Sequence, residues 1–238
     1  MACTTSIGPG ATNLVTAAAV AHVNRLPLLL IPGDVFASRR PDPVLQQVED
    51  FGDGTVSASH CLRPVSRYFD RITRPEQIIP AFARAMAVLA DPAECGPVTL
   101  AFCQDVQCEA YDYPARLFTP YLRSPRRQGP DAAELAAAAA IRAARKPFVV
   151  VGSGVRYAEA EVLLGDFCAA RGLPMGETQA GKPAVPDDMA LNLGALGVTG
   201  TSAANAMAAE ADLVIAMARG YRISPPAHAP YSKVPGGG

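Results

Sequence analysis

Short apolar runs, glycine turns and helical stretches alternate along this sequence, and this alternation constrains the fold more than any other feature. Residues 2–6 predict a short strand, which Ile7-Gly8-Pro9-Gly10 breaks. Residues 11–24 predict a helix of small and aliphatic side chains, and residues 26–32 predict a buried strand. A strand, a tight turn, a helix and another strand in succession build parallel sheets. The sequence therefore predicts an α/β fold.

The alternation continues to about residue 103 and then stops. Thr73 and Glu76 have the spacing of a capping box at the start of a helix, and residues 97–103 predict a strand. Val44 to Phe51 could form a short helix. Residues 110–130 hold four prolines and four arginines with little periodicity, which is typical of a linker.

The same alternation restarts after the linker. Asp131, with Glu134 three residues later, predicts a helix start, and Gly172 predicts the end of a helix over residues 157–171. Strands are predicted at 148–151, around Met175 and at 213–217, and a helix capped by Thr201 or Ser202 is predicted through Glu210. We therefore predict two consecutive parallel-sheet α/β units. Residues 1–115 would form the first domain, 116–130 the linker and 131–238 the second domain.

Composition excludes several classes of function. The 21 basic and 22 acidic residues leave a net charge of −1, so nothing favours nucleic acid or an anionic membrane as a partner. The strongest apolar run, Leu26 to Pro32, is too short to span a bilayer, and the N-terminus has no secretory pattern. The six cysteines form no Cys-x-x-Cys pair and the three histidines lie far apart, which excludes a zinc site. We expect a soluble, cytoplasmic protein.

Three glycine motifs are weak signals. Gly152-Ser153-Gly154 follows a strand, but Tyr157 stands where a dinucleotide fingerprint needs its third glycine. Gly52-Asp53-Gly54 is best interpreted as a surface turn. The run from Gly176 to Lys182 has P-loop spacing, but Pro183 replaces the hydroxyl residue that would hold magnesium, so a nucleotide triphosphatase is rejected. Gln179 and Lys182 remain candidates for contacting a polar ligand.

A fourth glycine motif, the turn Gly8-Pro9-Gly10, is more suggestive than these three. It follows a strand and precedes a helix, where glycine lets the backbone approach a ligand and the helix start offers free N–H groups. Spacing alone leaves open whether it binds a ligand or is merely a tight turn.

The residues around this turn carry a family resemblance. The run Thr5-Ser6-Ile7-Gly8-Pro9-Gly10-Ala11-Thr12-Asn13-Leu14-Val15-Thr16 resembles the pyrimidine-binding domain of the acetolactate-synthase-like thiamine-diphosphate enzymes. The strand from Pro27 to Gly33 and the segment containing Gln46 also fit. Within this family, several runs are most similar to the hydrolases that open trihydroxycyclohexane-1,2-diones in inositol catabolism. These runs are 32–37, 40–43, 46–51, 63–70 and 177–182.

The resemblance implies three α/β domains, of which residues 1–115 match the later part of the first and residues from 131 match most of a Rossmann-like second. The family's cofactor-activating glutamate precedes the glycine turn, and its magnesium and diphosphate motif lies in the third domain. We expect both outside this chain, so we assign it no catalytic residue and no metal ligand and expect no turnover by it alone. The sequence after Met217 departs from the family, and a frameshift or an assembly break would produce such an aberrant tail.

The resemblance also implies site residues and partners. Gly8, Pro9, Gly10, Asn13 and Gln46 would surround the thiamine diphosphate, and Mg²⁺ would accompany it in the complete enzyme. Gln179 and Lys182 would lie on the substrate side, the substrate being a small polyol-derived dione. The family's active site lies between subunits, which implies a homo-oligomer.

Two alternatives remain open. One is a different enzyme of the same cofactor class, such as an acetolactate synthase, although the runs 63–70 and 177–182 disfavour it. The other is a non-catalytic remnant, folded or partly folded, with weak ligand binding at most. We also expect poor solubility when the chain is expressed by itself, because exposed sheet edges and apolar helix faces favour association.

Overall fold

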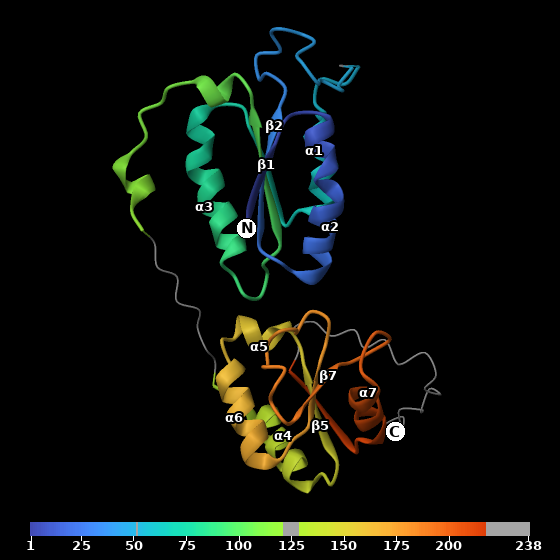
Figure 1. Ribbon diagram of the computed structural model, residues 1–238. Helices are drawn as coiled ribbons and strands as arrows, with labels where there is room; N and C mark the ends of the chain where they lie inside the picture. Colours follow the sequence, from blue (N-terminus) through green and yellow to red (C-terminus); the bar gives the residue numbers. More distant parts are fainter. Residues whose placement is uncertain (51, 121–128, 218–238) are drawn as a thin grey trace, which may run out of the picture. The chain divides into compact units, whose positions relative to one another are not determined.

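A computed structural model describes residues 1–50, 52–120 and 129–217. The chain divides into two compact units, Met1–Arg126 and Arg127–Gly238 (Figure 1). Each unit is built on one four-stranded parallel sheet, which confirms the predicted fold class of two consecutive α/β units. The predicted limits of the two domains and the linker stay a prediction, and the segment after Met217 lies outside the described residues.

The sheet of the first unit has the strand order β1-β2-β4-β3. Its strands are β1 (Ala2–Thr5), β2 (Leu28–Asp34), β3 (Tyr68–Ile72) and β4 (Pro97–Cys103). Strand β4, predicted over the same residues, is central and buried along nearly its whole length. Strand β3 lies at one edge and was not predicted, because it carries Asp70 and Arg71 in place of apolar side chains.

Helices cover both faces of this sheet. Helices α1 (Pro9–Asn13) and α2 (Val15–Asn24) lie on one face and α3 (Ile78–Leu89) on the other (Figure 1). Short 3₁₀ helices connect these elements: η1 (Ala58–Val65), η2 (Pro75–Gln77), η3 (Val106–Cys108) and η4 (Ala115–Phe118). Alanines on the inner faces of the helices allow them to lie close to the sheet, and Ala18 and Ala85 are fully buried.

Three local predictions for this unit were wrong. The single helix expected over 11–24 is interrupted at Leu14, between α1 and α2. The capping box expected at Thr73 and Glu76 lies one residue later, at Arg74 and Gln77 of η2, and the Gln77 side-chain oxygen accepts hydrogen bonds from the backbone N–H groups of Thr73 and Arg74. Residues 44–50 form a turn at Leu45 and Gln46 and otherwise no regular secondary structure, rather than a helix.

The sheet of the second unit has the strand order β7-β6-β5-β8. Its strands are β5 (Pro147–Val151), β6 (Met175–Glu177), β7 (Asn192–Ala195) and β8 (Leu213–Met217). Its helices are α4 (Ala132–Ala143), α5 (Ser153–Tyr157), α6 (Glu161–Arg171) and α7 (Ser202–Glu210). Helices α4, α5 and α6 lie on one side of the sheet and α7 on the other (Figure 1).

The predicted helix ends of this unit are confirmed. Asp131 accepts a hydrogen bond from the backbone N–H of Glu134, and Thr201 accepts one from Ala204. Gly172 ends α6 in the left-handed conformation, with a φ of 65°. The start of the helix expected over 157–171 was wrong: α6 begins at Glu161, and the separate short helix α5, which was not predicted, precedes it.

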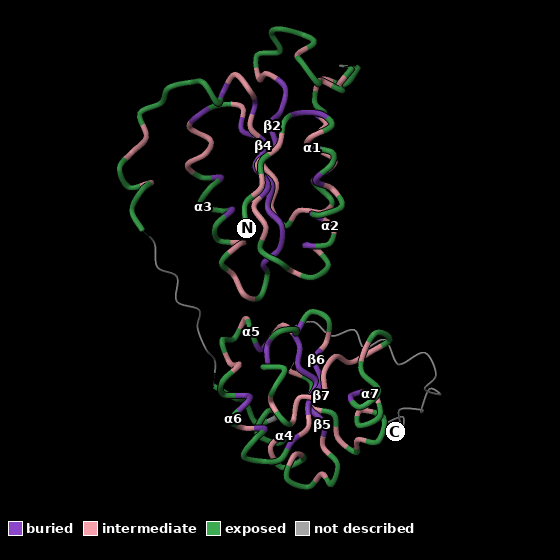
Figure 2. Tube along the Cα trace, viewed as in Figure 1, coloured by how far each residue is buried: buried purple, intermediate pink, exposed green. Residues whose placement is uncertain are grey.

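The core of the second unit lies between its sheet and α6. Buried side chains of β5, Val149 and Val151, pack there against Leu164 and Cys168 of α6. Figure 2 shows burial concentrated along the central strands of both units and exposure along the outer surfaces of the helices. Helix α4 is the least embedded helix, because none of its described side chains is buried.

Candidate functional site

The Gly8-Pro9-Gly10 turn stands at the carboxyl end of β1, where α1 begins. The backbone N–H of Gly10 donates to the carbonyl of Ile7 over 3.2 Å, and that of Thr12 donates to the carbonyl of Gly8 over 3.0 Å. Gly8 has a φ of 56° and a ψ of −113°. A Cβ atom on Gly8 would lie 2.0 Å from the carbonyl oxygen of Gln46 and 3.2 Å from Cγ1 of Val48. Only glycine fits here, because any side chain would collide with the backbone of a distant segment.

The structure therefore brings Gly8 and Gln46 together, although 37 residues separate them in the chain. Gln46 also has a positive φ, 66°, which turns its carbonyl onto Gly8. Pro9 and Gly10 complete the turn. Asn13 ends α1 with its side chain exposed. The assignment of these five residues to a cofactor site stays a prediction.

Thr5 is a further polar group at this turn, and sequence reasoning did not single it out as part of a site. Its hydroxyl oxygen is buried without a hydrogen-bond partner, a property it shares among the described residues only with Oε2 of Glu177. A Cβ atom on Gly10 would lie 3.4 Å from Cβ of Thr5 and 2.5 Å from Oγ of Ser6. The turn thus combines backbone without side chains and a free hydroxyl group. This arrangement fits the polar edge of a ring such as an aminopyrimidine.

Two carboxylates hold the segment 35–57 that contacts Gly8. Oδ2 of Asp34 accepts hydrogen bonds from Nε of Arg71 over 2.7 Å and from Oγ of Ser57 over 3.0 Å, and Asp34 is only 2% exposed. Asp105 accepts hydrogen bonds from the backbone N–H groups of Ala37 and Ser38. One end of the segment is therefore fixed at Asp34, the last residue of β2, and the other at Asp105, the N-cap of η3 just after β4. No local sequence signal could have shown these contacts.

The titratable groups near Asp34 have pKa values shifted by burial and by neighbouring charges. Burial disfavours the charged form of Arg71, but the hydrogen bond and the charge of Asp34 outweigh it, so the pKa of Arg71 is raised. Burial raises the pKa of the nearby Cys103 thiol to about 12. Burial and the charge of Arg63 lower the pKa of His60, whose Nδ1 accepts a hydrogen bond from the backbone of Ser57. Because burial raises its pKa, the Cys103 thiol is not an activated nucleophile.

In the second unit, Gln179 and Lys182 lie on the loop that follows β6. Both side chains are exposed, and Nζ of Lys182 forms an ion pair with Oδ1 of Asp187 over 3.0 Å. The hydrogen bond and charge of Asp187 raise the pKa of Lys182, so its ammonium group is charged at neutral pH. The substrate-side role of Gln179 and Lys182 stays a prediction, and the structure does not place them relative to the Gly8 turn.

The loop after β6 is fixed at the end of β5. The backbone N–H of Thr178 donates to the carbonyl of Val151, and a Cβ atom on Gly181 would lie 2.2 Å from that same oxygen. Oε1 of the fully buried Glu177 accepts a hydrogen bond from the backbone of Val185. The loop thus covers the end of β5, where a dinucleotide-binding fold would hold its phosphates. This packing agrees with the weakness of the Gly152-Ser153-Gly154 signal.

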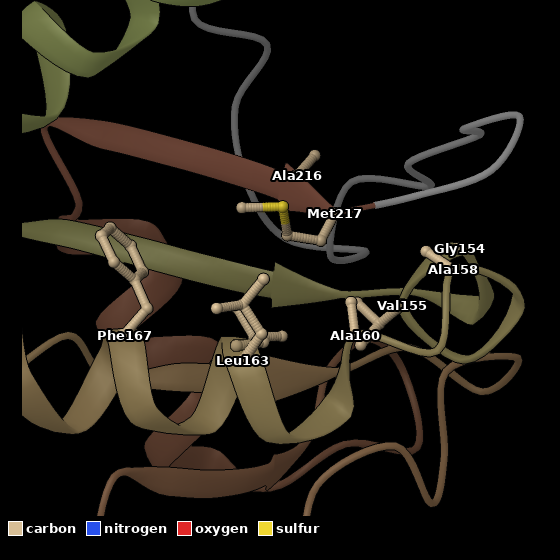
Figure 3. Close-up of a pocket in the computed structure, with 9 residues that line it drawn as sticks. Gly154, Val155, Ala158, Ala160, Leu163, Phe167, Ala216 and Met217 are labelled. Atoms are coloured by element: carbon tan, nitrogen blue, oxygen red, sulfur yellow. The ribbon is translucent and has the colours of Figure 1, made fainter. Parts of the chain in front are cut away.

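The second unit also has an apolar cavity of about 610 Å³ between α5, α6 and β8. Figure 3 shows Leu163, Phe167 and Met217 facing this cavity, and all nine residues that line it are apolar or glycine. None of the predicted site residues lines it. It lacks the polar groups that would orient a substrate for catalysis.

The remaining predictions concern the Gly52-Asp53-Gly54 turn, metal sites and membrane-spanning helices. Gly52-Asp53-Gly54 is an exposed turn, as predicted, and Oδ1 of Asp53 accepts hydrogen bonds from the backbone and hydroxyl of Thr55. Over the described ranges, no group of three or more histidine, cysteine, aspartate or glutamate residues could hold a metal ion. In those ranges no helix combines the length and the apolar character needed to cross a membrane.

Comparison with known families identifies both units. Residues 1–53 match the thiamine pyrophosphate enzyme N-terminal TPP binding domain, and residues 135–233 match the thiamine pyrophosphate enzyme central domain. Together the two matches cover more than half of the chain. The chain belongs to the thiamine pyrophosphate enzymes. Thiamine pyrophosphate is another name for thiamine diphosphate, so the predicted family is confirmed.

Among the thiamine pyrophosphate enzymes, the chain is similar to curated hydrolases from Bacillus. It is 51% identical over 216 residues to 3D-(3,5/4)-trihydroxycyclohexane-1,2-dione hydrolase 2 of a Bacillus cereus strain. It is 50% identical over the same length to 3D-(3,5/4)-trihydroxycyclohexane-1,2-dione hydrolase of Bacillus thuringiensis (strain Al Hakam). Each match covers 90% of this chain and 34% of the relative. The chain thus spans about a third of the length of the curated relatives it matches.

The predicted site residues divide between the two matches to thiamine pyrophosphate enzymes. Gly8, Pro9, Gly10, Asn13 and Gln46 fall within the TPP binding match, and Gln179 and Lys182 fall within the central-domain match. The buried Asp34 also lies in the first match. Its partner Arg71 lies beyond it.

Proposed function

We propose that this chain forms part of a thiamine-diphosphate-dependent hydrolase that uses water to open the ring of a trihydroxycyclohexane-1,2-dione, giving a deoxy-sugar acid. The observation that supports this proposal is the identity of 51% over 216 residues to a hydrolase of that name, extending over both units. The segments 63–70 and 177–182 also resemble these dione hydrolases. The same proposal includes Mg²⁺ beside the diphosphate, a role in inositol catabolism, a homo-oligomeric complete enzyme and a cytoplasmic location.

The chain's own contribution to this reaction would be to hold one end of the cofactor. When bound, thiamine diphosphate supplies a nucleophilic carbon and an electron sink for breaking a carbon–carbon bond. The Gly8-Pro9-Gly10 backbone would lie against its aminopyrimidine ring, and the free hydroxyl of Thr5 would be available to hydrogen-bond the ring. The carbonyl of Gln46, pressed onto Gly8, would fix the shape of this turn. Asn13, at the end of α1, would also lie near the cofactor.

The loop after β6 would serve the substrate. A polyol-derived dione offers hydroxyl and carbonyl oxygens, and an exposed amide and an exposed ammonium group can both hydrogen-bond to them. Gln179 and Lys182 are such groups. The hydrogen bonds of Thr178 and Glu177 hold the loop against β5 and β6, so the backbone that carries both side chains is fixed in position.

A chimera tests this proposal directly. Residues 1–217 of this chain would replace the matching segment of the Bacillus cereus relative, and the purified chimera would be assayed for opening of the dione ring. We expect ring opening that depends on added thiamine diphosphate and Mg²⁺, and we expect Gly8→Ala in the chimera to weaken cofactor binding. A folded chimera that binds the cofactor but leaves the dione intact would contradict the proposal.

The same chimera separates the two alternatives. Formation of acetolactate from pyruvate in place of ring opening would favour a different enzyme of the cofactor class. Failure to bind the cofactor would favour a non-catalytic remnant. For the chain by itself we expect no thermal stabilisation by thiamine diphosphate and Mg²⁺, since a ligand stabilises only a native state that binds it.

A further inference from the structure

A second cavity of the second unit, of about 470 Å³, lies beneath the last turns of α4 and α6. Its apolar wall includes Ile141 of α4 and Phe167 of α6, and three arginines also line it: Arg142, Arg145 and Arg171. Arg142 belongs to the last turn of α4, Arg145 to the connection from α4 to β5, and Arg171 to the last turn of α6. The volume is within the range of small-molecule pockets.

Carboxylates do not balance these three charges. No acidic residue lines the cavity, and among the described residues no ion pair within 4.0 Å joins any of the three guanidinium groups to a carboxylate. Asp212 feels the charge of Arg145, but its two oxygens accept hydrogen bonds from the backbone N–H groups of Arg145 and Lys146. That carboxylate therefore neutralises only part of the positive charge.

The helix ends do not remove the imbalance either. A helix C-terminus is equivalent to roughly −0.5 charge, so the ends of α4 and α6 together offset about one of the three arginines. Like charges around one cavity repel each other, and an anion between them lowers that repulsion. Arg142 and Arg145 both lie at the end of α4, where a single positive charge already exceeds the roughly −0.5 charge of the helix end, so stabilisation of helix ends does not account for all three arginines.

We infer that this cavity binds a small organic anion with a phosphate or carboxylate head and a flat apolar body. Guanidinium groups match both heads in bidentate geometry. The apolar body would lie against Phe167 and Ile141. The cavity is at the amino ends of β5 and β6, because Pro147 begins β5 and Leu173 precedes β6. It is therefore separate from the loop after β6 that carries Gln179 and Lys182, and the inference does not rest on the proposed function.

Binding of two matched probes to the purified 238-residue chain tests the inference. 1-Naphthyl phosphate carries both the head and the body, whereas 1-naphthol carries only the body. Calorimetric titration should show naphthyl phosphate binding roughly tenfold more tightly than naphthol at low salt, since one charge-assisted hydrogen bond contributes about that factor. The difference should shrink at high salt, because the three arginines are exposed.

Variants locate the binding. The double variant Arg142→Gln/Arg171→Gln keeps only Arg145 at the cavity and should lose most of the preference for naphthyl phosphate over naphthol, whereas Arg156→Gln should bind as the parent does. Arg156 is a matched control, because it is an exposed arginine of the same unit that does not line this cavity. Arg145→Gln changes a residue that follows the C-cap of α4 and is not part of the helix; it should lose several-fold in affinity and provides the test if the double variant does not fold. Equal affinity of the parent for the two probes, or an equal loss in Arg156→Gln, would overturn the inference.

Discussion

Replacing Gly8 by alanine should strongly destabilise the first unit. The backbone at Gly8, with a φ of 56° and a ψ of −113°, costs a residue with a side chain roughly 1–3 kcal/mol. The new Cβ would also start 2.0 Å from the carbonyl oxygen of Gln46, and overpacking of this kind costs roughly 1–3 kcal/mol more. The two terms together predict a loss of about 2–6 kcal/mol from the free energy of unfolding.

Two controls separate the causes of this loss. In Gly52→Ala the nearest atom to the new Cβ is 3.9 Å away, so stability should stay within about 0.5 kcal/mol of the parent. In Gly172→Ala the φ of 65° is equally positive, but nothing lies within 4 Å, so only the strain of roughly 1–2 kcal/mol remains. The excess of Gly8→Ala over Gly172→Ala measures the contact with Gln46 together with the additional strain at Gly8, whose ψ of −113° lies outside the left-handed helical region that Gly172 occupies with a ψ of 35°.

Urea unfolding monitored by circular dichroism gives the midpoints, and hydrogen exchange of peptides from β2 and β5 assigns each change to its unit. Gly8→Ala should raise exchange in β2 and leave β5 unchanged. If Gly8→Ala unfolds at the same urea concentration as Gly52→Ala, the segment 46–48 does not press on Gly8 in solution. The structural basis of the proposed cofactor turn would then be wrong.

Further predictions concern the charged and sulfur groups. Asp34→Asn should lower the stability of the first unit by about 2–3 kcal/mol in urea unfolding, because it leaves the guanidinium of Arg71 partly buried without its carboxylate; an unchanged midpoint would contradict this. Backbone hydrogen bonds lower the pKa of Asp212 below 3.8, so its stabilising contribution is complete above that pH and is lost as the pH falls through the folded-state pKa. The stability difference between the parent and Asp212→Asn should therefore vanish in strong acid, and a constant difference would refute the assignment. At pH 8, iodoacetamide followed by mass spectrometry should modify the exposed Cys108 well before Cys103, whose pKa is about 12; equal rates would show that Cys103 is not buried.

The parts of the fold that depend on local sequence were predictable. Asp131 and Gly172 mark helix ends through contacts within three or four residues, and both predictions are confirmed. The apolar segment of β4 has no alternative to burial, so its limits were predicted correctly. The alternation of such segments was enough to give two parallel-sheet units.

The missed strands depend on distant contacts. Strand β3 tolerates Arg71 because Asp34, in another strand, neutralises its charge. Strand β7 contains Gly194 at a φ of 91° and only four residues, so it has neither length nor alternation to reveal it. The capping box forms at Arg74 and Gln77 rather than at Thr73 and Glu76, and the Gln77 amide oxygen accepts hydrogen bonds from two backbone donors at once.

The candidate site was predictable only in part. Spacing marked the Gly8 turn as a place where backbone could approach a ligand, and family resemblance added Gln46. The contact between the two residues, the free hydroxyl of Thr5 and the hydrogen bonds of Asp34 join segments that lie far apart in the chain. They follow from tertiary packing, which no local pattern encodes.

The attachment of segment 35–57 at both ends bears on how this family can vary its sequence. Asp34 and Ser57 close the segment at its base, while Gly52 and Asp53 form an exposed turn at its tip. Residues added at such a tip leave the base intact, and a longer loop raises the entropic cost of closure only slowly. Relatives can therefore be expected to differ in length there while they retain the residues at the base. The same tip is a suitable place to insert a peptide tag or a fluorescent label without disturbing the Gly8 turn.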